Sequence, residues 1–336
     1  MNTLLLDRIH FAFTLTYHYL FPQLTMGLAL VIFVLKTRAH FRGDAAALEA
    51  SRFLIRLFGL GFVMGVVTGI PMEFQFGTNW ARFSSRSGGI IGQTLAMEGI
   101  FAFFLESSFL YVLLFGEKKF GPKLHYLSSL LLWLGTWTSG FFIVCTNAWM
   151  QHPVGYVVDA AGNFQLTSIG ALLGNPWAWV EYAHTSVGAT LTGAFATAAL
   201  AAFYCLRGRV TPAVERMFAA SIVIGAIASV AAAFPTGDLQ AKLVAKHQPT
   251  AFAAMEGHFH TEDGAGLTLI GQPNVTAQRI DNPLVIPGAL SFLTYQRWDA
   301  RIEGLNELPW EDWPEHIPLL YNSYHINYKL SYLRIH

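Results

Sequence analysis

Charged residues are scarce in this chain of 336 residues. Only 12% of them are Asp, Glu, Lys or Arg, about half the share found in ordinary soluble domains, which argues against a water-soluble globule. The 21 basic residues equal the 21 acidic ones, so the chain lacks the positive excess typical of nucleic-acid binders. The two cysteines, Cys145 and Cys205, each lie in an apolar run, where neither a disulfide framework nor a zinc site is expected.

Apolar residues are abundant instead, at 53% of the chain, which is the reverse of a disordered composition. About 20 apolar residues are needed to cross a bilayer as a helix, so runs of that length are candidate spans. Six occur, at about 11–35, 55–75, 94–115, 125–147, 183–206 and 216–235. The first run is too long for a signal peptide and has no small-residue cleavage site. The sequence therefore predicts an all-α, polytopic transmembrane helix bundle.

Lysine and arginine gather in the loops after the first, third and fifth runs, which we place in the cytoplasm because cytoplasmic loops carry the excess of these residues. They are Lys36, Arg38, Arg42, Arg52, Arg56, Lys118, Lys119, Lys123, Arg207, Arg209 and Arg216. The N-terminus and the polar stretch 236–316 then lie outside. We expect a six-helix membrane core over 1–235, an extracytoplasmic loop over 236–316 and an incomplete start of a seventh helix over 317–336.

Several ionisable residues interrupt the apolar runs, and such residues are functional candidates because their insertion is costly. They are His18, Glu73, Glu98, Glu106, Glu181 and His184. A single buried histidine is more often a hydrogen-bonded packing residue than a ligand, and Glu181 is near enough to a run's end to be solvated. However, a neutral imidazole in a helix bundle is also a common axial ligand of haem iron.

Glu98 and Glu106 are eight residues apart, which on an ideal helix gives about 12 Å of rise and about 80° of rotation. Both carboxylates then share one broad helix face, with Ser107 beside the second, and such a column suits proton relay. Small residues follow His184, among them Gly188 and Gly193. We expect these to let a flat ring approach the helix backbone.

Longer strings show a resemblance to a known family. They are YH at 17–18, MEFQFGTNW at 72–80, MEG at 97–99, FFLES at 103–107, NAWMQ at 147–151, AHT at 183–185, GDLQ at 237–240 and AAMEG at 253–257. In order and spacing the chain resembles subunit I of the cytochrome bd-type quinol oxidases as far as about residue 260.

The resemblance implies a respiratory terminal oxidase that oxidises a membrane quinol, either ubiquinol or menaquinol, reduces dioxygen to water and contributes to the proton gradient. The implied cofactors are haem b and haem d, or a second and third haem b in place of haem d. The implied partners are an oxidase subunit II, small single-span subunits and the lipid bilayer. The implied location is the plasma (inner) membrane of a bacterium or archaeon.

The resemblance also assigns haem contacts. His18 matches the axial ligand of a high-spin haem at the oxygen-reducing centre, and Glu98 matches an acid beside that haem that acts as a ligand or a proton gate. His184 matches an axial ligand of the low-spin haem b. Arg8 sits where the family has an arginine that pairs with a haem propionate.

Other matches concern protons and quinol. Glu106 with Ser107 matches the proton entry route, whereas the loop that begins near residue 237 matches the quinol-binding loop. Within it, Glu256 matches a glutamate that takes the quinol's proton, and Asp238 and Gln240 belong to the same loop.

The chain also departs from the family pattern. Asn327 stands where the second axial ligand of the low-spin haem, a methionine, is expected, and Ala251 replaces a common lysine. The family's subunit is also longer, so we interpret the end of the sequence as a truncation, a frameshift or an incomplete chain. The alternatives are a quinone-linked haem b subunit that does not reduce oxygen, a non-functional fragment, and a proton-coupled transporter without a cofactor.

Overall fold

The computed structural model describes residues 3–333. For Ala102 and for residues 327–333 it describes only the backbone. The chain divides into two compact units, Met1–Ala232 and Ala233–His336.

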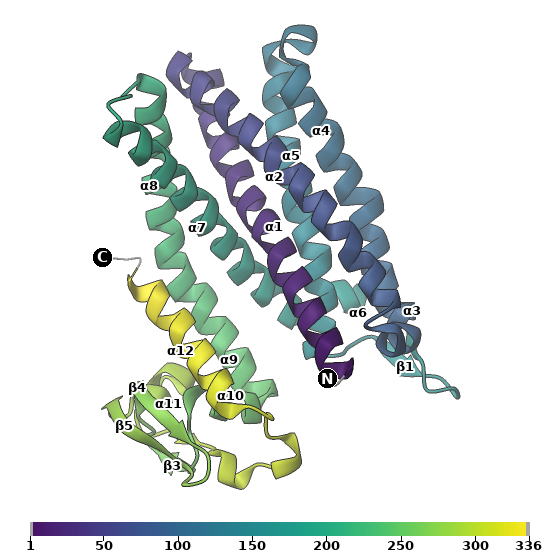
Figure 1. Cartoon of the computed structure of the whole chain (residues 1–336), viewed down its shortest axis with the longest axis vertical. Helices are drawn as coiled ribbons and strands as arrows, with labels where there is room; N and C mark the ends of the chain where they lie inside the picture. Colours follow the sequence, from purple (N-terminus) through teal and green to yellow (C-terminus); the bar gives the residue numbers. More distant parts are fainter. Residues whose placement is uncertain (1–2, 334–336) are drawn as a thin grey trace. The chain divides into compact units, whose positions relative to one another are not determined.

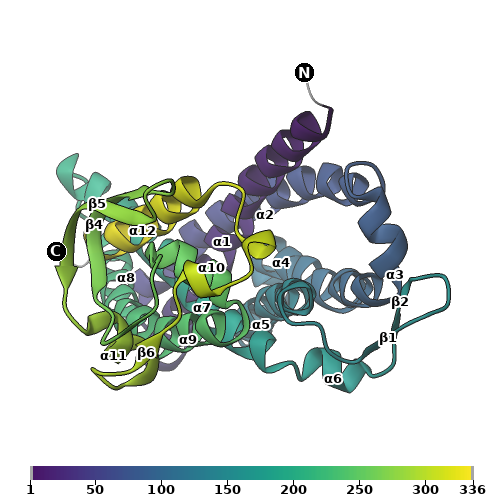
Figure 2. The same cartoon turned by 90° about the horizontal axis from the view of Figure 1, so that it is seen from below.

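The first unit is a set of long helices that run alongside one another (Figures 1 and 2). Its elements are α1 (Thr3–Arg42), α2 (Ala45–Gly77), α3 (Ala81–Met97), a π-helical segment (Glu98–Phe103), α4 (Phe104–Phe115), α5 (Glu117–Gln151), β1 (Tyr156–Val158), β2 (Phe164–Leu166), α6 (Ile169–Leu173), α7 (Pro176–Leu206) and α8 (Pro212–Ala231). Within the described residues, six helical stretches are long and apolar enough to cross a membrane. The predicted all-α bundle with six spans is therefore confirmed.

The helices extend beyond the apolar runs because local capping signals, and not hydrophobicity, set where they begin. Asp44 and Thr211 accept hydrogen bonds from the backbone N–H of Ala47 and Val214, at the starts of α2 and α8. Asn175 caps α7 in the same way and is followed by Pro176. Such caps satisfy amides that have no partner within the helix.

Helix α1 packs against α2, α5, α7 and α8. Its contact with α7 is closest at two glycines. A Cβ atom on Gly193 would lie 2.6 Å from Cα of Gly27, and one on Gly27 would lie 2.7 Å from the backbone nitrogen of Gly193. Because neither residue has a side chain, the two backbones touch directly, as small residues permit in membrane bundles.

An ion-pair cluster joins α1, the start of α2 and α8, at the end of the bundle where the predicted cytoplasmic lysines and arginines lie. The Asp44 carboxylate accepts hydrogen bonds from Nε of Arg38 at 2.6 Å and from Nε of Arg216 at 2.9 Å. These interactions, led by the one with Arg38, hold the pKa of Asp44 well below its usual range. The loop between α1 and α2 is thereby tied to the start of α8.

A buried lysine lies near the same end of α1. Nζ of Lys36 is 2.6 Å from Nδ1 of His125, and Nε2 of His125 is 3.0 Å from the carbonyl oxygen of Leu113. Only 5% of Lys36 and 1% of His125 is exposed. Since an ammonium has no lone pair, Lys36 donates to Nδ1, and the Nε2–H of His125 then donates to the last turn of α4. This chain of hydrogen bonds connects α1, α5 and α4.

We expect His125→Ala to destabilise the first unit more than Lys36→Met does. The alanine leaves the Lys36 ammonium buried without its partner, which costs about 3 kcal/mol or more, whereas methionine removes the charge and keeps most of the volume. The measurement is the free energy of unfolding of both variants in detergent. Equal stability of the two would contradict a buried charge at Lys36.

The second unit contains α9 (Asp238–His247), α10 (Pro249–Glu256), β3 (Glu262–Asp263), β4 (Leu267–Asn274), β5 (Arg279–Ile286), α11 (Ala289–Tyr295), β6 (Arg301–Ile302) and α12 (Ile317–Leu333). Strands β4 and β5 form an antiparallel hairpin, and β3 pairs with β6. Helix α12 packs against α10 and β4 (Figures 1 and 2). One apolar cluster, Ala253, Ala254, Phe259, Leu305 and Ile317, joins α10 to the start of α12.

The stretch that the sequence indicated only as a polar loop is thus an ordered structure with its own core. A break in the helical backbone at Phe234, before Pro235, precedes it. Residues 317–333 form a helix. The predicted mismatch at Asn327 falls where side chains are not described, and residues 334–336 lie outside the described part.

Candidate functional site

Glu98 and Glu106 both face α5. Oε1 of Glu106 accepts a hydrogen bond from Oγ1 of Thr136, and Oε1 of Glu98 accepts one from Oγ of Ser139, each at 3.0 Å. Only 7% of Glu106 is exposed. Glu98 also interacts electrostatically with Glu106 and with Glu73 of α2. Two carboxylates of the first unit are therefore hydrogen-bonded to α5, and a third, that of Glu73, interacts electrostatically with Glu98.

The helix between the two acids is not ideal. Residues Glu98–Phe103 form a π-helical segment, so the rotation expected for an uninterrupted α-helix does not apply. Despite the wider turn, both carboxylates are hydrogen-bonded to side chains of α5. Such π-helical turns are frequent at functional sites. Ser107 is different, because it is only partly buried and its hydroxyl donates to the carbonyl oxygen of Phe104.

His18 lies on α1 opposite α2, with Nδ1 3.1 Å from Oγ1 of Thr68. The hydroxyl hydrogen of Thr68 is directed to the carbonyl oxygen of Met64 at 2.7 Å. The Thr68 oxygen must then accept from the Nδ1–H of His18, which leaves the lone pair on Nε2. Gly69 gives the ring room, since a Cβ there would lie 3.1 Å from Cε1 of His18. An imidazole oriented in this way through its other nitrogen is typical of metal-bound histidines.

His184 lies near the start of α7 and is partly buried. The glycines that follow it serve helix packing. A Cβ on Gly188 would lie 3.3 Å from Nε2 of Gln23, and Gly193 contacts the backbone of α1 at Gly27. The expectation that these residues admit a flat ring is wrong at Gly193, because α1 already fills that space. Arg8 is exposed on the second turn of α1.

A single histidine can hold a haem iron in the axial position. Among residues 3–333, no three His, Cys, Asp or Glu side chains come together as a metal-ion site. The tautomer of His18 fits a haem ligand, because Nε2 carries the lone pair that iron requires. The residues present in the first unit therefore fit this cofactor at His18.

Glu256 is the last residue of α10 and only 6% of it is exposed. Burial raises its pKa to about 7, and a hydrogen bond from Tyr324 opposes this rise. Of the two other predicted loop residues, Asp238 accepts from Lys242 at 2.7 Å, and Gln240 has a buried Oε1 atom without a hydrogen-bond partner in the part of the chain that the structure describes. The carboxyl of Glu256 can thus exchange a proton near neutral pH.

The residues that orient the predicted acids were missed by the sequence analysis. Thr136 and Ser139 are three residues apart in the fourth apolar run, so they lie on one helix face. That spacing was a usable signal. Thr68 and Tyr324 carried no such signal, because their partners are far away in the sequence.

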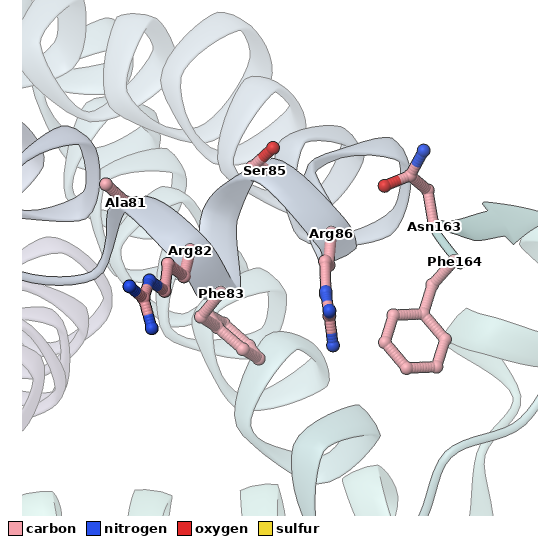
Figure 3. A pocket seen from close by; sticks show the side chains of 7 residues that line it. All are labelled: Ala81, Arg82, Phe83, Ser85, Arg86, Asn163 and Phe164. Carbon is pink, nitrogen blue, oxygen red and sulfur yellow. The ribbon is translucent and has the colours of Figure 1, made fainter. Parts of the chain in front are cut away.

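The structure also has an open pocket of about 860 Å³ between α3 and β2 (Figure 3). Its lining is Ala81, Arg82, Phe83, Ser85, Arg86, Asn163 and Phe164. Both arginines are exposed, and none of the predicted site residues lines the pocket. Neither Glu98 nor Glu106 lines it.

Comparison with known proteins adds to this geometry. Residues 6–335 match the family model of the cytochrome bd terminal oxidase subunit I, which extends beyond the motifs seen in the sequence. The chain belongs to this family. It is a multi-pass membrane protein.

Relatives of this subunit I chain include a cytochrome bd ubiquinol oxidase subunit 1 of Bacillus subtilis, at 35% identity over 92% of this chain and 66% of the relative. A cytochrome bd-II ubiquinol oxidase subunit 1 of Escherichia coli is 37% identical over 92% of this chain and 60% of the relative. The bd oxidase structure from Geobacillus thermodenitrificans matches with a TM-score of 0.91 and 30% identity, covering 98% of this chain and 75% of that one. The chain thus spans less than two thirds of the length of both curated relatives.

Proposed function

We propose that this chain is the haem-binding subunit of a respiratory terminal oxidase that oxidises a membrane quinol and reduces dioxygen to water. The observation that carries the proposal is the environment of His18, in a chain of this family. Thr68 fixes its tautomer, and the remaining nitrogen is a ligand atom. His18 and His184 would each hold a haem, b or d in type, and the haems would supply electron transfer and oxygen reduction.

The chain's own residues then handle protons on two sides. In the first unit, Glu106 and Glu98 would pass protons toward the oxygen-reducing site, and Thr136 and Ser139 orient their carboxylates. A carboxyl group buried beside a like charge can hold or release a proton as its neighbour's charge changes. We place Ser107 at the entrance of the proton route. Arg8 would pair with a haem propionate.

In the second unit, Glu256 would take a proton from the quinol, in a quinol-binding segment that includes Asp238 and Gln240 over residues 236–316. We place this segment and the N-terminus outside the membrane, and the basic loops inside. Protons released outside and consumed from inside contribute to the proton gradient. The expected partners are an oxidase subunit II and small single-span subunits.

The test is spectroscopic. The chain should be purified with its subunit II and examined by reduced-minus-oxidised and carbon monoxide difference spectra, together with quinol-dependent oxygen uptake. A haem that binds carbon monoxide supports the oxidase. A six-coordinate haem without carbon monoxide binding would favour the electron-transfer subunit, and absence of haem would favour the transporter.

The pH dependence of quinol oxidation tests Glu256 separately. Because the carboxyl must be ionised to accept a proton and its pKa is about 7, the rate should be maximal above pH 7 and fall as the pH drops below it. Glu256→Gln should lower the rate about 100-fold and remove this dependence. Glu215→Gln, at an exposed acid of α8 outside the quinol-binding segment, is the matched control. An unchanged pH profile in Glu256→Gln would contradict the role.

A further inference from the structure

Tyr321 of α12 is held against the end of α10, next to Glu256. Only 1% of Tyr321 is exposed. Its ring lies close to Gly257, because a Cβ atom added to that glycine would be 2.8 Å from Cε2 of the tyrosine. The ring of His325 also stacks on it, with centroids 3.8 Å apart.

The position of α12 is fixed by the same histidine. Nε2 of His325 is 3.0 Å from the carbonyl oxygen of Thr268 in β4, and Nδ1 is 3.0 Å from that of Tyr321. His325 is buried. The stacked ring of Tyr321 is therefore held in one orientation.

Two polar atoms in this small region have no partner among the described residues. Oη of Tyr321 and Oε2 of Glu256 are both buried without a hydrogen bond to any described side chain or backbone group, and each such atom costs about 1–3 kcal/mol. Tyr321 feels the charge of Glu256, and burial together with this charge raises the pKa of Tyr321 to about 12. The phenol hence stays protonated and is a donor, whereas the ionised carboxylate is an acceptor.

A hydroxyl group satisfies both atoms, because it donates one hydrogen bond and accepts another. We propose that Tyr321 and Glu256 together bind one hydroxyl, which donates to Oε2 of Glu256 and accepts from Oη of Tyr321. This inference rests on the proposed function, and the hydroxyl is that of the quinol or of a water that carries its proton. In the transfer, the O–H bond of the bound group breaks and an O–H bond forms on Glu256. Tyr321 keeps its own proton and holds the oxygen left behind.

Tyr321→Phe in the assembled oxidase tests this role, since it removes only Oη and keeps the stacked ring. The matched control is Tyr111→Phe, at an exposed tyrosine of α4 outside the quinol-binding segment. Loss of one hydrogen bond to the reacting group corresponds to about a tenfold effect. A tenfold rise in KM for a short-chain quinol, with kcat unchanged, identifies the quinol's own hydroxyl. A tenfold fall in kcat with unchanged KM, and a larger solvent isotope effect, identifies a relaying water.

A second variant is needed if the Tyr321→Phe protein does not assemble into the oxidase. With 3-fluorotyrosine at position 321 the shape is kept and the hydroxyl is a stronger donor, so the affected constant should move in the opposite direction, by about twofold. If Tyr321→Phe and the fluorinated protein both match Tyr111→Phe while Glu256→Gln is impaired, the role of Tyr321 is overturned and the proposed function stands. A wild-type complex that does not oxidise quinol would instead overturn the proposed function.

Discussion

Replacing Gly193 by alanine is expected to destabilise the first unit by more than about 4 kcal/mol, a loss reserved for severe packing defects. The added Cβ would lie 2.5 Å from the backbone nitrogen of Leu28 and 2.6 Å from Cα of Gly27. Backbone atoms cannot move aside as a flexible side chain can, so α1 and α7 must separate. Because α1 also packs against α2, α5 and α8, the displacement reaches most of the bundle.

The matched control is Gly92→Ala on α3, where nothing lies within 4 Å of the added atom. Alanine favours the helix there by up to about 1 kcal/mol. Denaturant unfolding of both variants in the same detergent gives their free energies of unfolding. Their difference separates the effect of crowding at Gly193 from that of helix propensity. Equal free energies of unfolding would show that the two backbones are not in contact.

Glu98→Gln is expected to lower quinol-dependent oxygen uptake about 100-fold, which is the low end of what a positioned acid or base contributes. The amide keeps the size of the side chain and can still accept from Ser139, but it cannot take up and release a proton. Electron entry from quinol should be unaffected, so the haems should become reduced and stay reduced. The effect therefore separates proton delivery from quinol binding.

Two further variants sharpen this test. Glu215→Gln changes an exposed acid of α8 and should leave oxygen uptake unchanged. Ser139→Ala removes the hydrogen bond that orients Glu98 and should cost only a few-fold, because the carboxyl itself remains. Full activity of Glu98→Gln would remove this residue from the proton route.

Local patterns in the sequence were sufficient for the architecture. A run of about 20 apolar residues satisfies its own backbone hydrogen bonds as a helix, whatever its neighbours are, so six spans could be counted in advance. The family likewise followed from local strings such as the one at 72–80. The second unit was harder, since short strands such as β4 and β5 give weak signals in a polar segment and become stable only when paired.

Contacts between helices were decided only by the tertiary structure. The sequence indicated that Glu98 and Glu106 matter, but the π-helical segment between them and their partners on α5 depend on how α4 packs. Ideal-helix arithmetic could not include a local widening of the turn.

By itself, the sequence determined the helical class, the number of spans and the family, because hydrophobic length and short motifs are properties of neighbouring residues. Only the tertiary structure decided that Thr68 orients His18, that Lys36 meets His125 and that Tyr321 lies against Glu256's neighbour Gly257. These pairs are separated by 50 or more residues. Their meeting depends on packing across the whole of a unit, which no local pattern encodes.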